Sequence, residues 1–270
     1  MDHHVHTKLC RHAEGVAEDY VKSAIQKGLS IIGFNEHFPM RYLPDTIPVE
    51  EYAMEYEEFP GYIKELKRLR EKYAGQIQVK IATEVDYYVP AIDEIKTLLE
   101  PFMDDLDYLY GSVHVVDDWA VDDSRFEQHW MAAENDVVYA KYYKNIKSMA
   151  QTRIFDVVGH LDLPKKYEHY PSGDRSVLLS LERALNAIAD SNMVIEVNTA
   201  GLRKPVKELY PSETILKDIL NRGIKITLGS DAHHPDEVGY EFDGVIAQLK
   251  ALGFKTIETF RRRVRTSIEI

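Results

Sequence analysis

The sequence predicts an α/β fold in which repeated βα units surround a parallel sheet. Short runs rich in β-branched and aromatic residues alternate along the 270 residues with longer runs in which apolar residues recur three and four positions apart, as expected of βα units. No linker rich in Pro, Gly or Ser interrupts the chain, and its composition does not shift along its length. We therefore expect one domain over residues 1–270.

Seven strands are expected, because seven short runs combine aliphatic and β-branched residues between turn formers. Their ranges are Asp2–His6, Ser30–Phe34, Gln78–Thr83, Tyr108–Val113, Phe155–Gly159, Met193–Val197 and Lys225–Leu228. A weaker eighth candidate covers Phe254–Ile257.

Amphipathic stretches between the strands predict the helices. The apolar stripes run through Val177, Leu178, Leu181, Ala184, Leu185 and Ile188, through Val21, Ala24 and Ile25, and through Ile63, Leu66, Leu69 and Tyr73. Gly28, Gly75 and Gly223 are expected to end three helices in the left-handed conformation. The basic run Arg261–Arg265 is expected on a solvated C-terminal helix or at a surface between subunits.

Two long irregular stretches, Pro39–Tyr56 and Val115–Ala133, are rich in acidic and aromatic residues. Stretches of this length inside a compact domain usually serve function or move. We expect both to flank the site that the strand ends build.

The composition excludes several classes of protein. A formal net charge of −12 disfavours nucleic-acid partners, which require basic surfaces, and no window holds the roughly 18 apolar residues needed to cross a membrane. The single cysteine cannot form an internal disulfide, which with the lack of a signal peptide predicts a cytoplasmic protein. We expect a small-molecule substrate as the partner, and a homo-oligomer is compatible with the sequence.

Nearly every predicted strand ends in a histidine or a carboxylate. In a barrel of parallel strands these ends meet at one rim, where active sites are assembled. The rim residues are His4, His6, His12, His37, Glu84, His114, His160, Asp231 and His233. Alternation along the first strand puts His4 and His6 on one face, a spacing that suits two ligands of one metal ion. Nine such groups exceed the needs of one ion, and imidazoles with carboxylates favour Zn, Fe or Mn over Ca or Mg.

The order of these nine residues resembles the metal site of the polymerase and histidinol phosphatase (PHP) superfamily. The segments Cys10–Gly15, Gly159–Leu163 and Asn198–Pro205 are similar to its histidinol-phosphatase branch, and the resemblance spans essentially the whole chain. It implies a distorted (β/α)7 barrel, similar to a TIM barrel, that holds two to three divalent metal ions. The implied ligand sets are His4, His6, Glu84 and Asp231 for the first ion, a bridging Glu84 with His114 and His160 for the second, and His12, His37 and His233 for the third.

Such a site predicts phosphate chemistry. Three divalent ions beside two carboxylates and seven neutral imidazoles leave about four positive charges, which attract a phosphate dianion. Because metal ions generate hydroxide at neutral pH, we expect a metal-bridging hydroxide to hydrolyse a phosphomonoester, with Glu84, Asp231 and His233 acting through it. The resemblance makes L-histidinol phosphate the expected substrate and histidine biosynthesis the expected pathway.

Three further residues are assigned to the substrate. Arg203 is expected to clamp the phosphate, because a guanidinium binds two phosphate oxygens and the branch carries a matching arginine. Lys165 is a second candidate for this role, with Lys166 as its competitor. Glu14 is expected to supply negative charge for the ammonium group of the substrate, together with Asp86.

Three alternatives stay open at this point. The same site would serve another small phosphomonoester, such as a nucleotide, a phosphotyrosine or a sugar phosphate, because fold and metals do not fix the substrate. A non-catalytic PHP module is disfavoured by the full ligand set. A metal-dependent amidohydrolase, whose barrel also opens with His-x-His, is disfavoured by His12 and His37. Cys10 is expected to be a thiol outside the ligand set, and His129 lies outside any motif.

Overall fold

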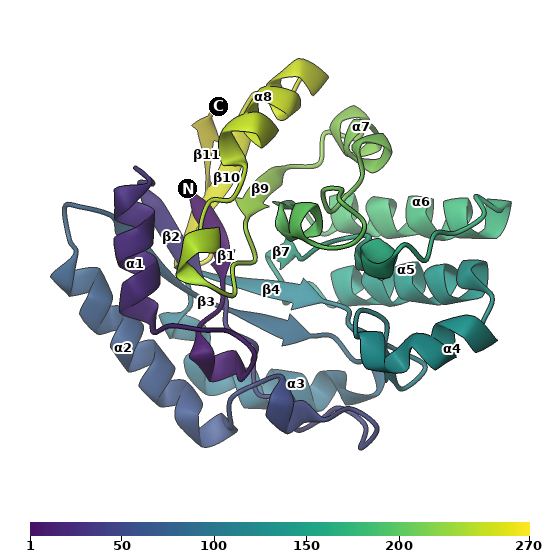
Figure 1. Ribbon diagram of the computed structural model, residues 1–270, viewed down its shortest axis with the longest axis horizontal. Helices are drawn as coiled ribbons and strands as arrows, with labels where there is room; N and C mark the ends of the chain where they lie inside the picture. The colour runs from purple at the N-terminus through teal and green to yellow at the C-terminus, as the bar shows by residue number, and fades with distance from the viewer.

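A computed structural model describes residues 1–270 of the chain. Seven parallel strands form one sheet in their sequence order: β1 (Asp2–Val5), β2 (Ile31–Phe34), β3 (Gln78–Asp86), β4 (Tyr108–Ser112), β7 (Val157–Val158), β8 (Val194–Asn198) and β9 (Ile226–Gly229). A parallel bridge between Val5 and Ala232 joins the two edge strands, so the sheet curls into a nearly closed barrel (Figure 1). The predicted α/β barrel is confirmed, and each of the seven predicted strands overlaps an observed one.

Helices surround the barrel on its outside (Figure 1). They are α1 (Ala17–Gln26), α2 (Phe59–Lys72), α3 (Ile92–Leu99), α4 (Glu127–Ala132), α5 (Asn135–Gln151), α6 (Arg175–Asp190), α7 (Glu213–Asn221) and α8 (Phe242–Leu252). The predicted stripes on α1 and α2 face the barrel, and a cluster of 72 buried apolar residues fills the space between strands and helices. No helix is long and apolar enough to cross a membrane.

Local sequence features end and orient these helices. Gly28, Gly75 and Gly223 have φ values of +72°, +82° and +68°, which confirms the left-handed conformation predicted for them. The stripe predicted for α6 is wrong at Leu178, whose side chain is 58% exposed. Leu178 follows the buried Val177 by one position, and a step of about 100° along a helix turns the next side chain away from the packed face.

The C-terminal residues form a hairpin, which corrects two predictions. The eighth candidate strand belongs to β10 (Thr256–Arg261), which pairs with β11 (Val264–Glu269) in an antiparallel ladder outside the barrel. The basic run Arg261–Arg265 is therefore a turn between two strands and not a helix. Arg262 and Arg263 close this turn in left-handed conformations, between flanking runs in which β-branched residues favour strands.

This hairpin covers the amino end of the barrel. The Arg263 side chain donates two hydrogen bonds to the carboxylate of Asp156, which lies just before β7. The Phe260 ring packs beside Tyr108, with 5.5 Å between ring centroids, and joins the buried side chains that fill the barrel interior. The interior is thus closed at its amino end, and access is confined to the carboxyl end.

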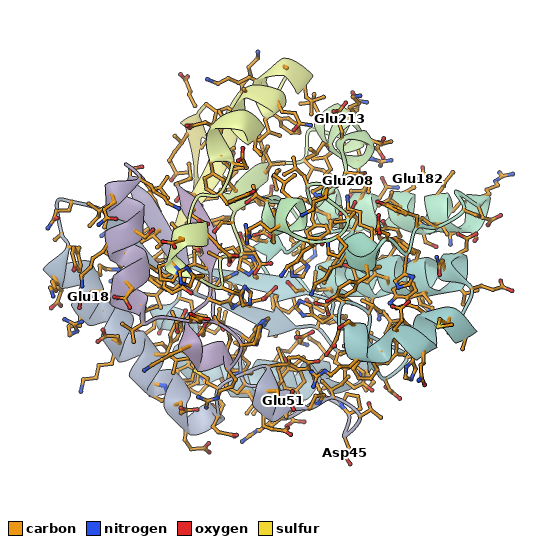
Figure 2. All side chains as sticks on the ribbon, viewed as in Figure 1. Glu18, Asp45, Glu51, Glu182, Glu208 and Glu213 are labelled. Carbon is orange, nitrogen blue, oxygen red and sulfur yellow. The ribbon has the colours of Figure 1, made fainter.

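The two long stretches lie over the carboxyl rim. Pro39–Tyr56 is mostly irregular, and Figure 2 shows its Asp45 and Glu51 at the outer edge of the molecule. Val115–Ala133 contains the small hairpin β5 (Val115–Val116) and β6 (Trp119–Ala120) as well as α4. The two stretches contact one another, because Arg125 Nη1 donates to Glu51 across 2.6 Å.

Candidate metal centre

The nine rim residues predicted from the strand ends lie together at the carboxyl end of the barrel. They form three groups in which all donor atoms lie within 4.8 Å of one another: His4, His6 and Glu84; Glu84, His114 and His160; and His12, His37 and His233. Asp231 adjoins the first group, with its Oδ1 atom 3.2 Å from His6 Nε2. Their placement follows from parallel pairing, since residues that end neighbouring strands reach the same rim.

Glu84 on β3 lies between two of these groups. Its Oε2 atom is 3.4 Å from His4 Nε2 and 3.6 Å from His6 Nε2. Its Oε1 atom is 2.9 Å from His160 Nε2 and accepts a hydrogen bond from Ser112 Oγ. The residue is 1% exposed. A carboxylate whose two oxygens face two donor groups has the geometry of a bridging ligand.

Hydrogen bonds around the third group leave two lone pairs facing each other. His12 Nδ1 donates to the Cys10 carbonyl oxygen (2.7 Å), and His233 Nδ1 donates to the Asp231 carbonyl oxygen (3.0 Å). These partners assign the one proton of each neutral ring to Nδ1. Both Nε2 atoms therefore carry lone pairs although they are only 3.0 Å apart. Such an arrangement is repulsive unless a cation lies beside it, so this group fits a metal ion.

In the second group, hydrogen bonding orients one of the two imidazoles. His114 Nδ1 is 2.9 Å from a carboxylate oxygen of Asp86, so the proton lies there and the lone pair lies on Nε2. That Nε2 atom is 3.2 Å from His160 Nε2. A carboxylate behind a ligating imidazole fixes the tautomer and raises the basicity of the ligand. Asp86 therefore orients His114, and its predicted place beside the substrate ammonium group stays a prediction.

The charges within the site keep its carboxylates ionised. Burial opposes ionisation of Glu84, but the imidazoles of His4 and His37 outweigh burial and hold the pKa of Glu84 well below its usual value. Burial also opposes ionisation of Asp231, whose pKa is nevertheless depressed by His4 and His6. Divalent ions bind the anionic carboxylates and displace the protons of the imidazoles, which then act as ligands.

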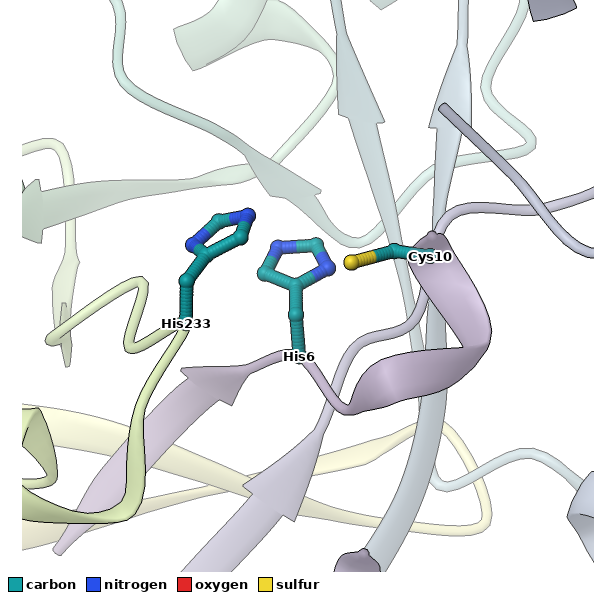
Figure 3. Close-up of side chains that lie close together, drawn as sticks. All are labelled: His6, Cys10 and His233. Carbon is teal, nitrogen blue, oxygen red and sulfur yellow. The ribbon is translucent and has the colours of Figure 1, made fainter. Parts of the chain in front are cut away.

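Cys10 lies next to the donor groups without being a predicted ligand. Figure 3 shows its side chain pointing toward the His6 ring, with the His233 ring on the other side of His6. The three donor atoms lie within 4.8 Å of one another. Burial and the nearby Glu36 carboxylate raise the pKa of the Cys10 thiol, so this side chain is a neutral thiol here. We keep it outside the proposed ligand sets.

The cavity above the metal donors contains two lysines, Lys166 and Lys204. Lys166 Nζ is 3.0 Å from Asp122 Oδ2. Burial lowers the pKa of Lys166, but Asp122 outweighs burial and the pKa is raised. Burial and the neighbouring Lys166 lower the pKa of Lys204. Lys166 is thus a cation at the wall of the cavity.

The three predicted substrate residues have three different environments in the structure. Arg203 donates from Nη2 to the carbonyl oxygens of Ser230 and Asp231, while its Nη1 atom is buried without a hydrogen-bond partner. Lys165 Nζ is bound by Asp162, Glu208 and the Leu209 carbonyl oxygen, so its ammonium group is not directed into the cavity. The Glu14 side chain is 83% exposed and does not line the cavity.

A second cavity of about 170 Å³ continues from the first and shares its histidine wall. Asp86, Lys166 and Tyr167 form part of the remaining wall, and the rest comes from the two long stretches that cover the rim. The lining residues from these stretches are Met40, Leu43, Ile47, Tyr52, Val115, Ala120, Asp122 and Asp123. The second cavity is therefore apolar with an acidic edge.

The other histidines lie outside the donor groups. His3 also faces the barrel interior, because an irregularity in β1 between Asp2 and Val5 breaks the alternation of its side chains. Its ring lies beside Tyr108 and hydrogen-bonds Thr259 Oγ1. His129 stacks on Trp119 with 5.3 Å between ring centroids. One buried residue on β8, Glu196, was not predicted from the sequence, and Asn198 was predicted only as part of the segment Asn198–Pro205. A charged residue inside the apolar run Met193–Val197 was the one signal for Glu196.

The fold and the donor groups define the class of parallel barrels that use divalent metal ions at their carboxyl rim. Comparison with known proteins narrows this class. Residues 2–200 match the model of the PHP domain, and the chain belongs to the PHP family, in its histidinol-phosphatase branch.

Individual relatives agree with this assignment. A probable histidinol-phosphatase of Deinococcus radiodurans is 36% identical over 97% of this chain and 96% of its own length. The histidinol-phosphatase of Bacillus subtilis is 30% identical over 91% of this chain and 97% of its own. The crystal structure of histidinol phosphate phosphatase from Lactococcus lactis, complexed with Zn, L-histidinol and phosphate, has a TM-score of 0.81 at 23% identity and covers 98% of each chain. That likeness shows the fold.

Proposed function

We propose that this protein is a metal-dependent phosphomonoester hydrolase that converts L-histidinol phosphate to L-histidinol and phosphate. The observation that carries the proposal is the facing pair of Nε2 lone pairs in the third donor group, beside a Glu84 carboxylate that two other groups share. Relatives named histidinol-phosphatase along nearly the whole chain support the substrate. The proposal includes a cytoplasmic location.

Two to three divalent ions, of Zn, Fe or Mn, fit these donors. The proposed ligands are those expected from the sequence: His4, His6, Glu84 and Asp231; Glu84, His114 and His160; and His12, His37 and His233. When bound, such ions supply Lewis acidity, which lowers the pKa of water and neutralises the charge of a phosphate ester. The protein itself holds the donor atoms in place and binds the phosphate ester.

The cationic side of the cavity suits the phosphate group. Lys166 is held there by Asp122 and carries a positive charge, and Lys204 lies beside it. Arg203 remains a proposed phosphate ligand through its unpartnered Nη1 atom, while its Nη2 atom fixes the backbone of Ser230 and Asp231. Charge-assisted hydrogen bonds from such groups contribute about 1.5–3 kcal/mol each.

The second cavity suits the remainder of the substrate. L-histidinol phosphate carries an imidazole and an ammonium group as well as the phosphate. Apolar side chains such as Leu43 and Ile47 provide a surface for the ring. Three carboxylates, of Asp86, Asp122 and Asp123, line the same cavity and are the proposed partners of the ammonium group, with Asp122 also paired to Lys166 and Asp123 to Arg125. A sugar phosphate lacks both features, whereas phosphotyrosine has both, so the cavity disfavours the sugar phosphate.

The test is phosphate release from L-histidinol phosphate, beside a nucleotide, a sugar phosphate and phosphotyrosine, on protein whose metal content is measured in the same preparation. We expect two to three metal ions per chain and a strong preference for L-histidinol phosphate. Turnover of another phosphomonoester in preference to it would reassign the substrate. Bound metal without any turnover would instead favour a non-catalytic module.

A further inference from the structure

A buried carboxylate beneath the metal donors, Glu196, is not a member of any predicted ligand set. It lies on β8 with its side chain inside the barrel and is 0% exposed. Transfer of an ionised carboxylate out of water costs several kcal/mol, and such a group persists only where its oxygens receive hydrogen bonds. The hydrogen-bond partners of Glu196 therefore indicate the role of this carboxylate.

Glu196 accepts three hydrogen bonds, and each leads to a proposed metal donor. Its Oε1 atom accepts from His4 Nδ1 across 2.6 Å. Its Oε2 atom accepts from the backbone N–H of His160 across 3.0 Å and from Asn198 Nδ2 across 3.0 Å. The same Asn198 amide nitrogen is 3.3 Å from Asp231 Oδ2. One carboxylate is thus linked to donors at three different strands, directly to His4 and His160 and through Asn198 to Asp231.

The hydrogen bond between Glu196 and His4 determines which nitrogen of the His4 ring carries a lone pair. Because Glu196 holds the proton of His4 on Nδ1, the lone pair lies on Nε2. That Nε2 atom is the one directed toward Glu84 and His6. Without Glu196, either ring nitrogen would carry the proton, and the ring would be free to turn.

The neighbouring strand leaves room for this contact. Gly229 on β9 has no side chain, and a Cβ atom there would overlap Glu196 Oε1 and lie 2.6 Å from His4 Cβ. Any larger residue at position 229 would therefore push the carboxylate away from the imidazole. The close approach of β8 and β1 side chains depends on this glycine.

We propose that Glu196 is a positioning residue of the metal centre: it fixes the tautomer of His4 and ties His4, His160 and Asp231 into one geometry. The inference rests on the proposed metal centre. Outer hydrogen-bond partners of metal ligands typically contribute 10- to 100-fold in metal affinity. Glu196 acts on donors of both groups that share Glu84, so its loss would weaken both.

The experiment measures Zn²⁺ affinity of metal-free protein by competition with a chromophoric chelator. We expect Glu196→Gln to weaken Zn²⁺ binding by about 10- to 100-fold, because its amide cannot accept from three donors at once. In ¹⁵N-histidine NMR spectra of the Zn²⁺-loaded protein, His4 should lose the fixed Nδ1–H tautomer expected in the wild type. A loss of stability alone would not produce this change.

The matched control is Asp107→Asn. Asp107 is also a buried carboxylate with several hydrogen-bond partners, among them the backbone N–H groups of Ile81 and Arg262, but it lies at the amino end of the barrel. We expect its Zn²⁺ affinity and His4 tautomer to be those of the wild type. A loss of affinity in this control as large as in Glu196→Gln would overturn the specific role of Glu196.

Other outcomes separate this inference from the proposed function. If a folded Glu196→Gln protein has the Zn²⁺ affinity and the His4 tautomer of the wild type, the positioning role is overturned. The proposed phosphatase function is not affected by that outcome. If Glu196→Gln does not fold, Glu196→Asp keeps the charge but retracts the oxygens, and unchanged affinity there would overturn the role as well. A wild-type protein that binds Zn²⁺ but does not hydrolyse L-histidinol phosphate would contradict the substrate only.

Discussion

Glu84 offers one oxygen to His4 and His6 and the other to His160. We predict that Glu84→Ala loses metal ions from both groups and lowers phosphate release by more than about 100-fold, since loss of a ligand exceeds the effect of losing an outer partner. Metal analysis and turnover on L-histidinol phosphate measure the two effects. His129→Ala is the control with unchanged activity, and activity above a tenth of wild type in Glu84→Ala would remove its bridging role.

Two adjacent lysines allow a sharper test of phosphate binding. Lys166 lines the cavity, whereas Lys165 is bound by Asp162 and Glu208. We predict that Lys166→Met lowers kcat/KM by about 10- to 100-fold with metal content unchanged, the size expected for a charge-assisted hydrogen bond.

The corresponding change at Lys165 should act on stability instead. Lys165→Met leaves the buried Asp162 without its cation, which costs about 3–5 kcal/mol of unfolding free energy, while kcat/KM of the folded protein is retained. Denaturant unfolding and steady-state kinetics of the two variants check the pair. If Lys165→Met lowers kcat/KM and Lys166→Met lowers the unfolding free energy instead, Lys165 is the phosphate ligand, as first expected from the sequence.

The sequence allowed prediction of single residues where position along a strand determines the environment. His4, His6 and Glu84 could be predicted because strand ends of a parallel barrel share one rim. Lys165 and Lys166 could not be told apart, because a short 3-10 helix, Leu163–Tyr167, determines which of the two faces the cavity. Glu196 could not be predicted either, because it belongs to no sequence motif and its hydrogen-bond partners come from three strands.

At the scale of elements, the C-terminal hairpin closes the barrel at its amino end. Phe260 is 4% exposed and packs against Tyr108 inside the barrel. We predict that Phe260→Ala lowers the free energy of unfolding by about 3–5 kcal/mol through the cavity it leaves. Urea unfolding of the metal-free protein measures this change, and the exposed Val264→Ala on the same hairpin is its control. A loss below 1 kcal/mol would mean that the hairpin is not part of the barrel core.

The same element shows where pattern reading fails. Repeated arginines favour a solvated helix when read alone, yet Arg263 is bound by Asp156 and the flanking residues are strand formers. The barrel strands were predictable because a buried parallel strand is apolar throughout. The hairpin was not, because its position depends on contacts with strands far away in the sequence.

At the scale of the whole molecule, metal removal should affect folding as well as activity. The donors come from strand ends around the barrel, and each ion present at 100 times its Kd adds about 2.7 kcal/mol of stability. We predict that a chelator abolishes phosphate release and lowers the melting temperature, and that Zn²⁺ or Mn²⁺ restores both. Calorimetry with and without chelator measures this, and an identical melting temperature would contradict metal ions at the barrel rim.

The closure of the barrel has a consequence for how the protein is made. Val5 at the end of β1 bridges Ala232, and His3 hydrogen-bonds Thr259, 256 residues further along the chain. The strand that carries His4 is therefore synthesised well before Ala232 and Thr259, and it cannot complete the barrel until these partners have been made. Asp231 and His233 belong to the same late segment, so the first and third donor groups are completed only after the second, whose members Glu84, His114 and His160 come earlier in the chain.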